Sequence, residues 1–234
     1  MTGERIRAAL SELALVFAGL LLGIVVFSAL RSLGLFSGVS TLGVGLVGGP
    51  LITGCAAAFY AWASRRAIRM PEPLATARAD VPGLRVLWVT TGCIALALVG
   101  SVLLGYLFEV LGVPVQEQET ILEIVEAARA GEDRLTIVVL GASAVVLAPL
   151  AEEWLFRGGL FRRLLGHTGR PFAYTASALG FAAIHNNPAG FVIYLWLGLV
   201  FALAIDRTNR LGSAIAVHVA NNAFAFAMLV LGEG

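Results

Sequence analysis

Three short patterns in the last third of the chain place ionisable and amide side chains inside apolar segments. They are Glu152-Glu153-Trp154-Leu155-Phe156-Arg157, Phe181-Ala182-Ala183-Ile184-His185 and His218-Val219-Ala220-Asn221-Asn222. A charge near the middle of a bilayer costs several kcal/mol, so it persists mainly where a site needs it. Together, the three patterns predict catalysis within a membrane.

The first pattern sets two glutamates side by side on a predicted helix. Residues four apart share a helix face, whereas adjacent residues diverge by about 100°. Glu153 and Arg157 are therefore positioned for an ion pair, while Glu152 points elsewhere and has no helical partner. We expect Glu152 to be a general base, with Glu153 and Arg157 as its structural support. The alternative is that both glutamates are solvated at the cytoplasmic interface.

The other two patterns add imidazole and amide groups. His185 ends an apolar segment with Phe181 one turn earlier on its face, and His218 shares a face with Asn222. A carboxylate, two imidazoles and an amide from three helices can together activate water and stabilise an oxyanion. We expect Glu152 and His185 to form the acid–base pair, with His218 and Asn222 donating to the developing negative charge.

A zinc site is the alternative arrangement of these groups. Glu152, His185 and His218 can also hold zinc with water in the open position, and the sequence does not separate the two mechanisms. There is no compact two-histidine motif on one helix, and no His-Glu-x-x-His zinc-protease helix. No Gly-x-Ser-Gly stands near Ser143 or Ser177 to supply a serine nucleophile. No pair of intramembrane aspartates is expected, because all three lie at or outside predicted span ends: Asp80, Asp133 and Asp206.

The composition indicates an integral membrane protein of the all-α class. Hydrophobic residues make up 59% of the chain and charged residues 13%, with a mean hydropathy of +0.88. Soluble domains average roughly 45–50% apolar and about 25% charged residues. Apolar runs predict a polytopic bundle of about seven spans: Leu13–Leu30, Leu42–Trp62, Val86–Val113, Leu135–Phe156, Phe172–His185, Phe191–Ile205 and Ile215–Leu231.

The arginines predict the orientation of this bundle, because the chain has no lysine. With seven spans, all arginines except Arg31, Arg129 and Arg134 fall on one side of the membrane, and we count Arg157 among those that follow the fourth span. The positive-inside rule then puts the N-terminus in the cytoplasm and the C-terminus outside. His167 lies in an arginine-rich loop on that side and is expected to be solvated. No basic run indicates nucleic acid as a partner.

Two further features have simpler interpretations. The acidic outer segment from Gln116 to Asp133 has apolar residues spaced for one helix face, which predicts a short amphipathic helix on the outer surface. Cys55 and Cys93 lie in apolar stretches and form neither a zinc spacing nor a disulfide framework, so we expect both to pack as small hydrophobic residues.

The three patterns resemble the CPBP family, which comprises the type II CAAX prenyl proteases and their bacterial relatives, also called Abi proteins. Ala148 to Gly158 resembles the family's Glu-Glu-x-x-x-Arg motif, Phe181 to His185 resembles Phe-x-x-x-His, and His218 to Asn222 resembles His-x-x-x-Asn. All three occur in the family's order. Trp154 departs from the pattern, since an aliphatic residue is usual there.

The resemblance implies an intramembrane endopeptidase whose last four spans form a conical catalytic core. It divides the chain into residues 1–134, with the N-terminal helices and the outer amphipathic segment, and a catalytic core at 135–234. In the prenyl proteases, the counterparts of Glu152 and His185 activate water, and those of His218 and Asn222 form the oxyanion site. The family is often labelled metalloprotease, and its catalysis has also been described as glutamate-dependent without a metal. The expected partners are the lipid bilayer and a membrane-tethered protein or peptide substrate, and the expected location is a prokaryotic plasma membrane.

Two functions of other classes compete with proteolysis. Buried Glu and His side chains also mark ion pathways, so an ion-coupled transporter is one alternative, although no internal repeat of broken helices is visible. A non-catalytic membrane scaffold or immunity protein is the other.

Overall fold

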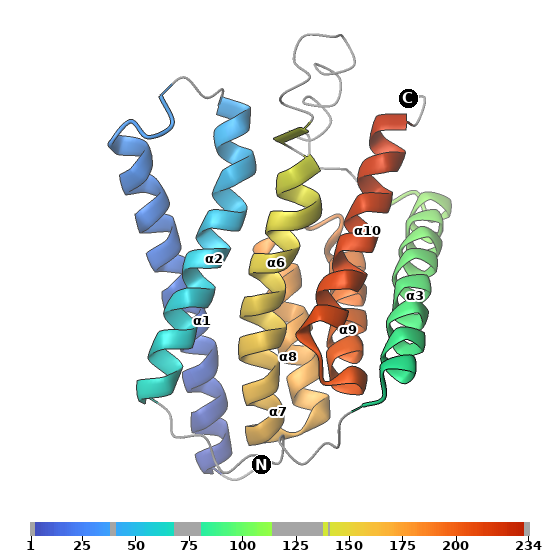
Figure 1. Cartoon of the computed structure of the whole chain (residues 1–234), viewed down its shortest axis with the longest axis horizontal. Helices are drawn as coiled ribbons and strands as arrows, with labels where there is room; N and C mark the ends of the chain where they lie inside the picture. Colours follow the sequence, from blue (N-terminus) through green and yellow to red (C-terminus); the bar gives the residue numbers. More distant parts are fainter. Residues whose placement is uncertain (1–2, 38–40, 68–80, 114–137, 140, 232–234) are drawn as a thin grey trace.

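The computed structural model of the chain describes residues 3–37, 41–67, 81–113, 138–139 and 141–231. The described elements are all helical and run as seven successive rods (Figure 1). The all-α membrane bundle predicted from the sequence is therefore confirmed. The rods are α1 (Gly3–Ser32), α2 (Thr41–Ala67), α3 (Gly83–Val110), a continuous central rod, α8 (Arg170–Ile184), α9 (Phe191–Thr208) and α10 (Leu211–Leu231).

The central rod joins four segments without a break between them. A π-helical segment η1 (Ser143–Leu147) leads into α6 (Ala148–Glu153), a second π-helical segment η2 (Trp154–Phe161) and α7 (Arg162–Thr168). Pro149 has no backbone N–H to donate to the preceding turn, which removes one α-helical hydrogen bond at the junction of η1 and α6. π-Helical turns are frequent at functional sites, and here they flank the paired glutamates.

Four of the described helices are long and apolar enough to cross a membrane: α1, α3, α9 and α10. Large apolar side chains such as Phe17, Trp88 and Tyr106 are exposed on α1 and α3. Exposed apolar surface of this extent marks contact with lipid or with another protein. The chain is therefore an integral membrane protein. The start of α1 and the end of α10 lie at opposite ends of the bundle (Figure 1).

Three expectations about the fourth span and the residues that follow it are wrong. The predicted end at Phe156 is too early, because the helical rod continues to Thr168. Arg157, which we counted among the basic residues after that span, is fully buried inside the bundle, and His167 is buried in α7 rather than solvated in a loop. Both side chains contact buried carboxylates inside the bundle. A pattern of apolar runs does not predict such contacts. The predicted helix within Gln116–Asp133 lies outside the described residues.

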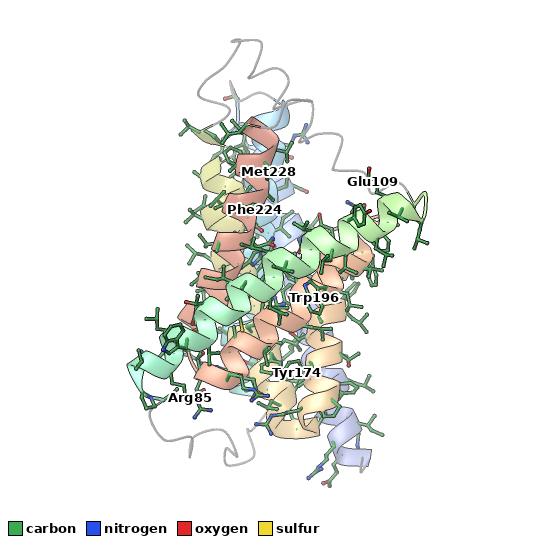
Figure 2. All side chains as sticks on the ribbon, turned by 90° about the vertical axis from the view of Figure 1, so that its right-hand side faces the viewer. Arg85, Glu109, Tyr174, Trp196, Phe224 and Met228 are labelled. Atoms are coloured by element: carbon green, nitrogen blue, oxygen red, sulfur yellow. The ribbon has the colours of Figure 1, made fainter. Side chains whose placement is uncertain are left out.

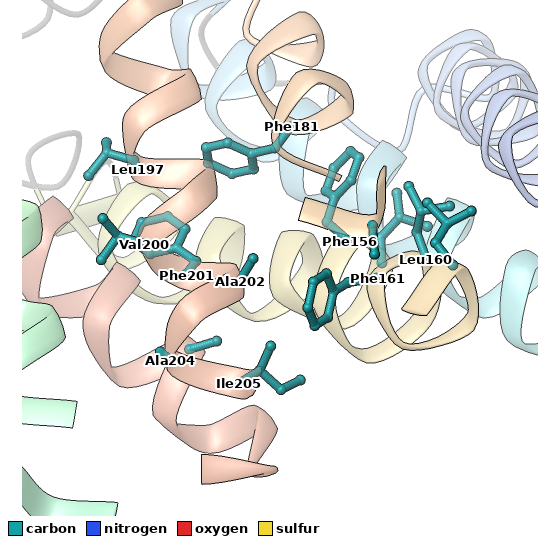
Figure 3. Close-up of a cluster of buried hydrophobic side chains, with 14 of the residues drawn as sticks. Phe156, Leu160, Phe161, Phe181, Leu197, Val200, Phe201, Ala202, Ala204 and Ile205 are labelled. Atoms are coloured by element: carbon teal, nitrogen blue, oxygen red, sulfur yellow. The ribbon is translucent and has the colours of Figure 1, made fainter. Parts of the chain in front are cut away.

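Aromatic side chains from three rods fill the centre of the bundle (Figure 3). Phe181 on α8 makes edge-to-face contacts with Phe156 of the central rod, at a centroid separation of 6.0 Å, and with Phe201 of α9, at 5.7 Å. Such pairs contribute about 0.5–1.5 kcal/mol each beyond their buried area. In lipid, helices associate through close packing rather than through exclusion of water, so this interlocked cluster fixes the rods around the site.

Small residues allow the flanking helices to approach closely. A Cβ atom at Gly23 on α1 would collide with the backbone of Ile52 on α2, so this position requires glycine. On the opposite flank, α3 runs obliquely across α9 and α10 (Figure 2). Trp196 of α9 fits against Gly100 of α3, and Thr90 of α3 donates a hydrogen bond of 3.0 Å to Ser213 of α10.

Candidate active site

The predicted ion pair within the first motif is present. Glu153 is fully buried, and its Oε1 accepts a hydrogen bond of 2.9 Å from Nη1 of Arg157, one turn further along the rod. Nη2 of Arg157 donates to the carbonyl oxygen of Gly198 on α9, at 3.0 Å. The ion pair therefore connects the central rod to α9 as well as closing one helical turn.

Three aromatic rings surround the buried guanidinium of Arg157. Its Cζ atom lies 4.5 Å from the ring centroid of Phe181, 5.2 Å from that of Phe201 and 5.9 Å from that of Phe156. A cation over an aromatic face is stabilised by the ring quadrupole, and more strongly where water is excluded. These rings and the Glu153 carboxylate together make burial of a full positive charge tolerable.

His218 on α10 lies between the two glutamates. Its Nδ1 is 3.0 Å from Oε1 of Glu153, and its Nε2 is 3.9 Å from Oε2 of Glu152. Its ring is stacked on that of Phe201, with centroids 4.4 Å apart and an interplanar angle of 21°. Because a carboxylate can only accept, Nδ1 carries the proton shared with Glu153, and Nε2 is the nitrogen presented to Glu152.

Glu152 lies on the part of the rod that faces His218 and is almost completely buried. Among the described residues, its Oε2 atom has no hydrogen-bond partner, and the same is true of Glu153 Oε2 and Arg157 Nε. Buried polar atoms are nearly always hydrogen-bonded in folded proteins, so a group of exceptions at one place calls for a functional explanation. The three atoms mark a polar centre that can bond a water molecule or a substrate.

His185 follows the last turn of α8. Its Nδ1 is 2.8 Å from the carbonyl oxygen of Phe181, which leaves Nε2 to carry the lone pair of the neutral ring. The ring stacks on Tyr194 of α9 at a centroid separation of 3.9 Å, and the Phe181 ring lies 4.7 Å from it and 5.5 Å from His218. Phe181 therefore contacts both imidazoles, as its place in the second motif would require of a supporting residue.

Asn222 joins α10 to the start of the central rod. Its Nδ2 donates a hydrogen bond of 2.9 Å to the carbonyl oxygen of Ala144 in η1, and its Oδ1 accepts one of 3.4 Å from Asn221. An amide nitrogen has two protons, so one N–H remains beyond the bond to Ala144. The expected role of Asn222 at an oxyanion remains a prediction.

The sequence analysis missed several groups in contact with the predicted site residues. Tyr194 and Phe201 stack on the two histidines, and the carbonyl oxygens of Gly198 and Ala144 accept from Arg157 and Asn222. Nothing in the sequence distinguishes these residues from the rest of their apolar helices. Their roles depend on contacts across the bundle.

The described residues do not form a metal site. Among them, no three His, Cys, Asp or Glu side chains are grouped closely enough to hold an ion. Glu152, His185 and His218 therefore do not fit a three-ligand zinc site in this arrangement.

The fold and the site define a polytopic helical membrane protein with a buried carboxylate–imidazole centre. The family model described as type II CAAX prenyl endopeptidase Rce1-like matches residues 134–224. All three motifs lie within these residues. The predicted resemblance to the CAAX prenyl proteases is therefore confirmed for the C-terminal part of the chain.

Two bacterial proteins give matches over parts of their length. The putative membrane peptidase YdiL of Bacillus subtilis (strain 168) is 28% identical over 160 residues, which cover 67% of this chain and 62% of that protein. The membrane-embedded CAAX protease MroQ of Staphylococcus aureus (strain USA300) is 36% identical over 85 residues, or 34% of each chain. The match therefore spans less than two thirds of either relative. No solved structure gives a significant match.

Proposed function

We propose that the protein is an intramembrane endopeptidase that hydrolyses peptide bonds of a membrane-tethered protein or peptide. The observation that carries the proposal is the pairing of Glu152 with His218. A buried carboxylate oxygen without a hydrogen-bond partner among the described residues faces an imidazole nitrogen 3.9 Å away. The descriptions of the matching family and of both relatives as peptidases or proteases support the same class of reaction.

In the proposed first step, Glu152 removes a proton from a water molecule. The separation of 3.9 Å between Glu152 and His218 is longer than a direct hydrogen bond, so a water oxygen can bond both groups as a third partner. The oxygen then attacks the carbon of the scissile carbonyl, and the proton remains on Glu152. His185 is the proposed partner of Glu152 in this step, in keeping with its place in the second motif.

In the second step, the tetrahedral intermediate collapses and the carbon–nitrogen bond breaks. The proton taken from water passes from Glu152 to the leaving nitrogen, so that the carboxylate is restored. His218 and the second N–H of Asn222 are the proposed donors to the oxyanion. Because Nδ1 of His218 carries a proton towards Glu153, its Nε2 can donate only when the ring holds both protons.

We further propose that cleavage occurs near the cytoplasmic face of a prokaryotic plasma membrane, with the N-terminus in the cytoplasm. Support comes from the distribution of the arginines, and from the two bacterial relatives. An odd number of crossings puts the chain ends on opposite sides, in keeping with their places at opposite ends of the bundle (Figure 1).

The proposal is tested by incubating the purified protein with a panel of membrane-tethered and prenylated peptides. The wild type is compared with Glu152→Gln, which removes the base but keeps the size of the side chain. Glu109→Gln, the same chemical change at the exposed end of α3, is the matched control. We expect the first variant to lose at least about a hundredfold in kcat, in line with the usual contribution of a general base, and the control to keep full activity.

The other outcomes separate the alternatives. Cleavage that survives in Glu152→Gln at the wild-type rate would overturn the assignment of the base. An ion flux that is lost in this variant, without any peptide being cleaved by the wild type, would indicate a transporter. Binding of a partner that is equal in both proteins, again without cleavage, would indicate a scaffold.

A further inference from the structure

A further buried carboxylate, outside the three motifs, lies at the opposite end of the central rod from η1. Glu12 on α1 is fully buried. Its Oε2 accepts a hydrogen bond of 2.5 Å from the hydroxyl of Tyr60 on α2. Its Oε1 lies 2.7 Å from Nε of Arg163 and 3.2 Å from Nε2 of His167, both on α7. We call these four residues the Glu12 cluster.

The Glu12 cluster connects the N-terminal helices to the rod that carries the proposed base. Arg163 and His167 are one turn apart and share a face of α7, so both reach the same carboxylate. Tyr60 also lies against the middle of η2, where a Cβ atom at Gly159 would come within 2.8 Å of its ring. A buried charge on one helix that accepts hydrogen bonds from two others holds the three together, because a partner left alone would be an uncompensated charge or donor.

The rod between Glu153 and Arg163 is π-helical, and this makes its two ends interdependent. A π turn contains more residues than an α turn, so each residue absorbed or released there rotates one end by about 100° relative to the other. The end at Glu153 is held by the bond from His218 to Glu153, and the end at α7 by the bonds from Arg163 and His167 to Glu12. With both ends fixed, η2 cannot change from π-helical to α-helical turns without breaking either the bond to Glu153 or the bonds to Glu12.

We propose that the Glu12 cluster keeps η2 in its π-helical register and so positions Glu152 opposite His218. Glu12 is a positioning residue in this proposal, since it acts through the rod and touches no reacting atom. The catalytic part of the inference rests on the proposed protease function, whereas the part concerning the register of η2 does not.

The test compares Glu12→Gln with Asp206→Asn in the full-length protein. Asp206 is an apt control, because it is a buried carboxylate that accepts from Arg170 at 3.0 Å and from Tyr174 at 3.2 Å. Both of these donors lie on α8, so the substitution leaves the bonds at both ends of η2 in place; Tyr174 contacts η2 only through its ring, which packs against Phe161. Backbone hydrogen exchange of Trp154–Phe161 is measured for both variants, together with Tm and the kcat and KM for the peptide that the wild type cleaves.

We expect Glu12→Gln to speed exchange within η2 and to lower kcat about tenfold or more, with little change in KM, since small displacements of a catalytic group have effects of this size. Asp206→Asn should lower Tm without either effect. The double variant Glu12→Gln/Arg163→Gln removes both charges of the Glu12–Arg163 pair, so it should regain much of the lost Tm but not the lost kcat. If Glu12→Gln does not fold, Tyr60→Phe removes a single donor from the cluster and is expected to act in the same direction.

If Glu12→Gln leaves the rate of backbone hydrogen exchange within η2 unchanged, the proposal is overturned, whatever the effect on activity. A fall in kcat for Asp206→Asn equal to that for Glu12→Gln would also overturn it, because the effect would then follow general stability. If the wild type cleaves no peptide, the proposed protease function fails, while the exchange measurement still decides the role of the Glu12 cluster.

Discussion

Glu153 holds Nδ1 of His218 at 3.0 Å, and this directs Nε2 of the same ring towards Glu152. The two adjacent glutamates therefore act on one imidazole from different sides. Glu153 fixes the tautomer and orientation of the ring, while Glu152 faces the nitrogen that remains available for chemistry. The Glu153–Arg157 pair is thus part of the geometry of the site as well as a support of the rod.

Glu153→Ala and Arg157→Ala should differ in activity although both damage stability. Each removes one member of a fully buried ion pair, which typically costs about 3–5 kcal/mol because the other charge is left uncompensated. Only Glu153→Ala also removes the partner of His218, so it should have the lower kcat at a temperature where both variants are folded. Thermal unfolding and peptide cleavage measured on the same preparations check this. Equal kcat values for the two folded variants would show that Glu153 does not orient His218.

The sequence predicted the class of fold and the ion pair of the candidate site for identifiable reasons. Charged residues are so costly in apolar helices that Glu152, His185 and His218 stood out, and the spacing of four predicted the Glu153–Arg157 pair. The pairing of Glu153 with His218 joins residues 65 positions apart, and no local pattern encodes it. The same holds for Glu12, which directly precedes the predicted first span in the sequence and accepts hydrogen bonds from donors on α2 and α7.

Proteolysis should survive treatment with a metal chelator. Glu152, His185 and His218 are not grouped closely enough to share an ion among the described residues. The protein is incubated with excess chelator, the chelator is removed, and cleavage is measured again. We expect the same kcat as before the treatment. Loss of cleavage with recovery on addition of zinc would contradict this, and would make these three residues candidate ligands.

Tyr194 should affect catalysis more than stability. Its ring stacks on that of His185 at 3.9 Å with an interplanar angle of 24°, which restricts rotation of the imidazole. Tyr194→Leu removes the flat surface and should lower kcat several-fold, whereas Tyr194→Phe keeps it and should stay close to the wild type. Cleavage rates and Tm for the two variants test the stacking directly. A loss in Tyr194→Phe as large as that in Tyr194→Leu would assign the effect to the hydroxyl instead.

The close contact between α1 and α2 predicts opposite effects for the same substitution at two glycines. Gly23→Ala brings a Cβ atom into the backbone of Ile52, so α1 must shift away from α2. Because Glu12 is also on α1, this shift strains the Glu12 cluster. A Cβ atom at Gly45 on α2 would meet no other atom within 4 Å, so Gly45→Ala should be neutral or stabilise the helix by up to about 1 kcal/mol. Thermal unfolding in detergent should therefore give a lower Tm for Gly23→Ala and an equal or higher Tm for Gly45→Ala. A Tm for Gly23→Ala that matches the wild type would mean that the two helices can separate without cost, and that α1 is not held by this contact.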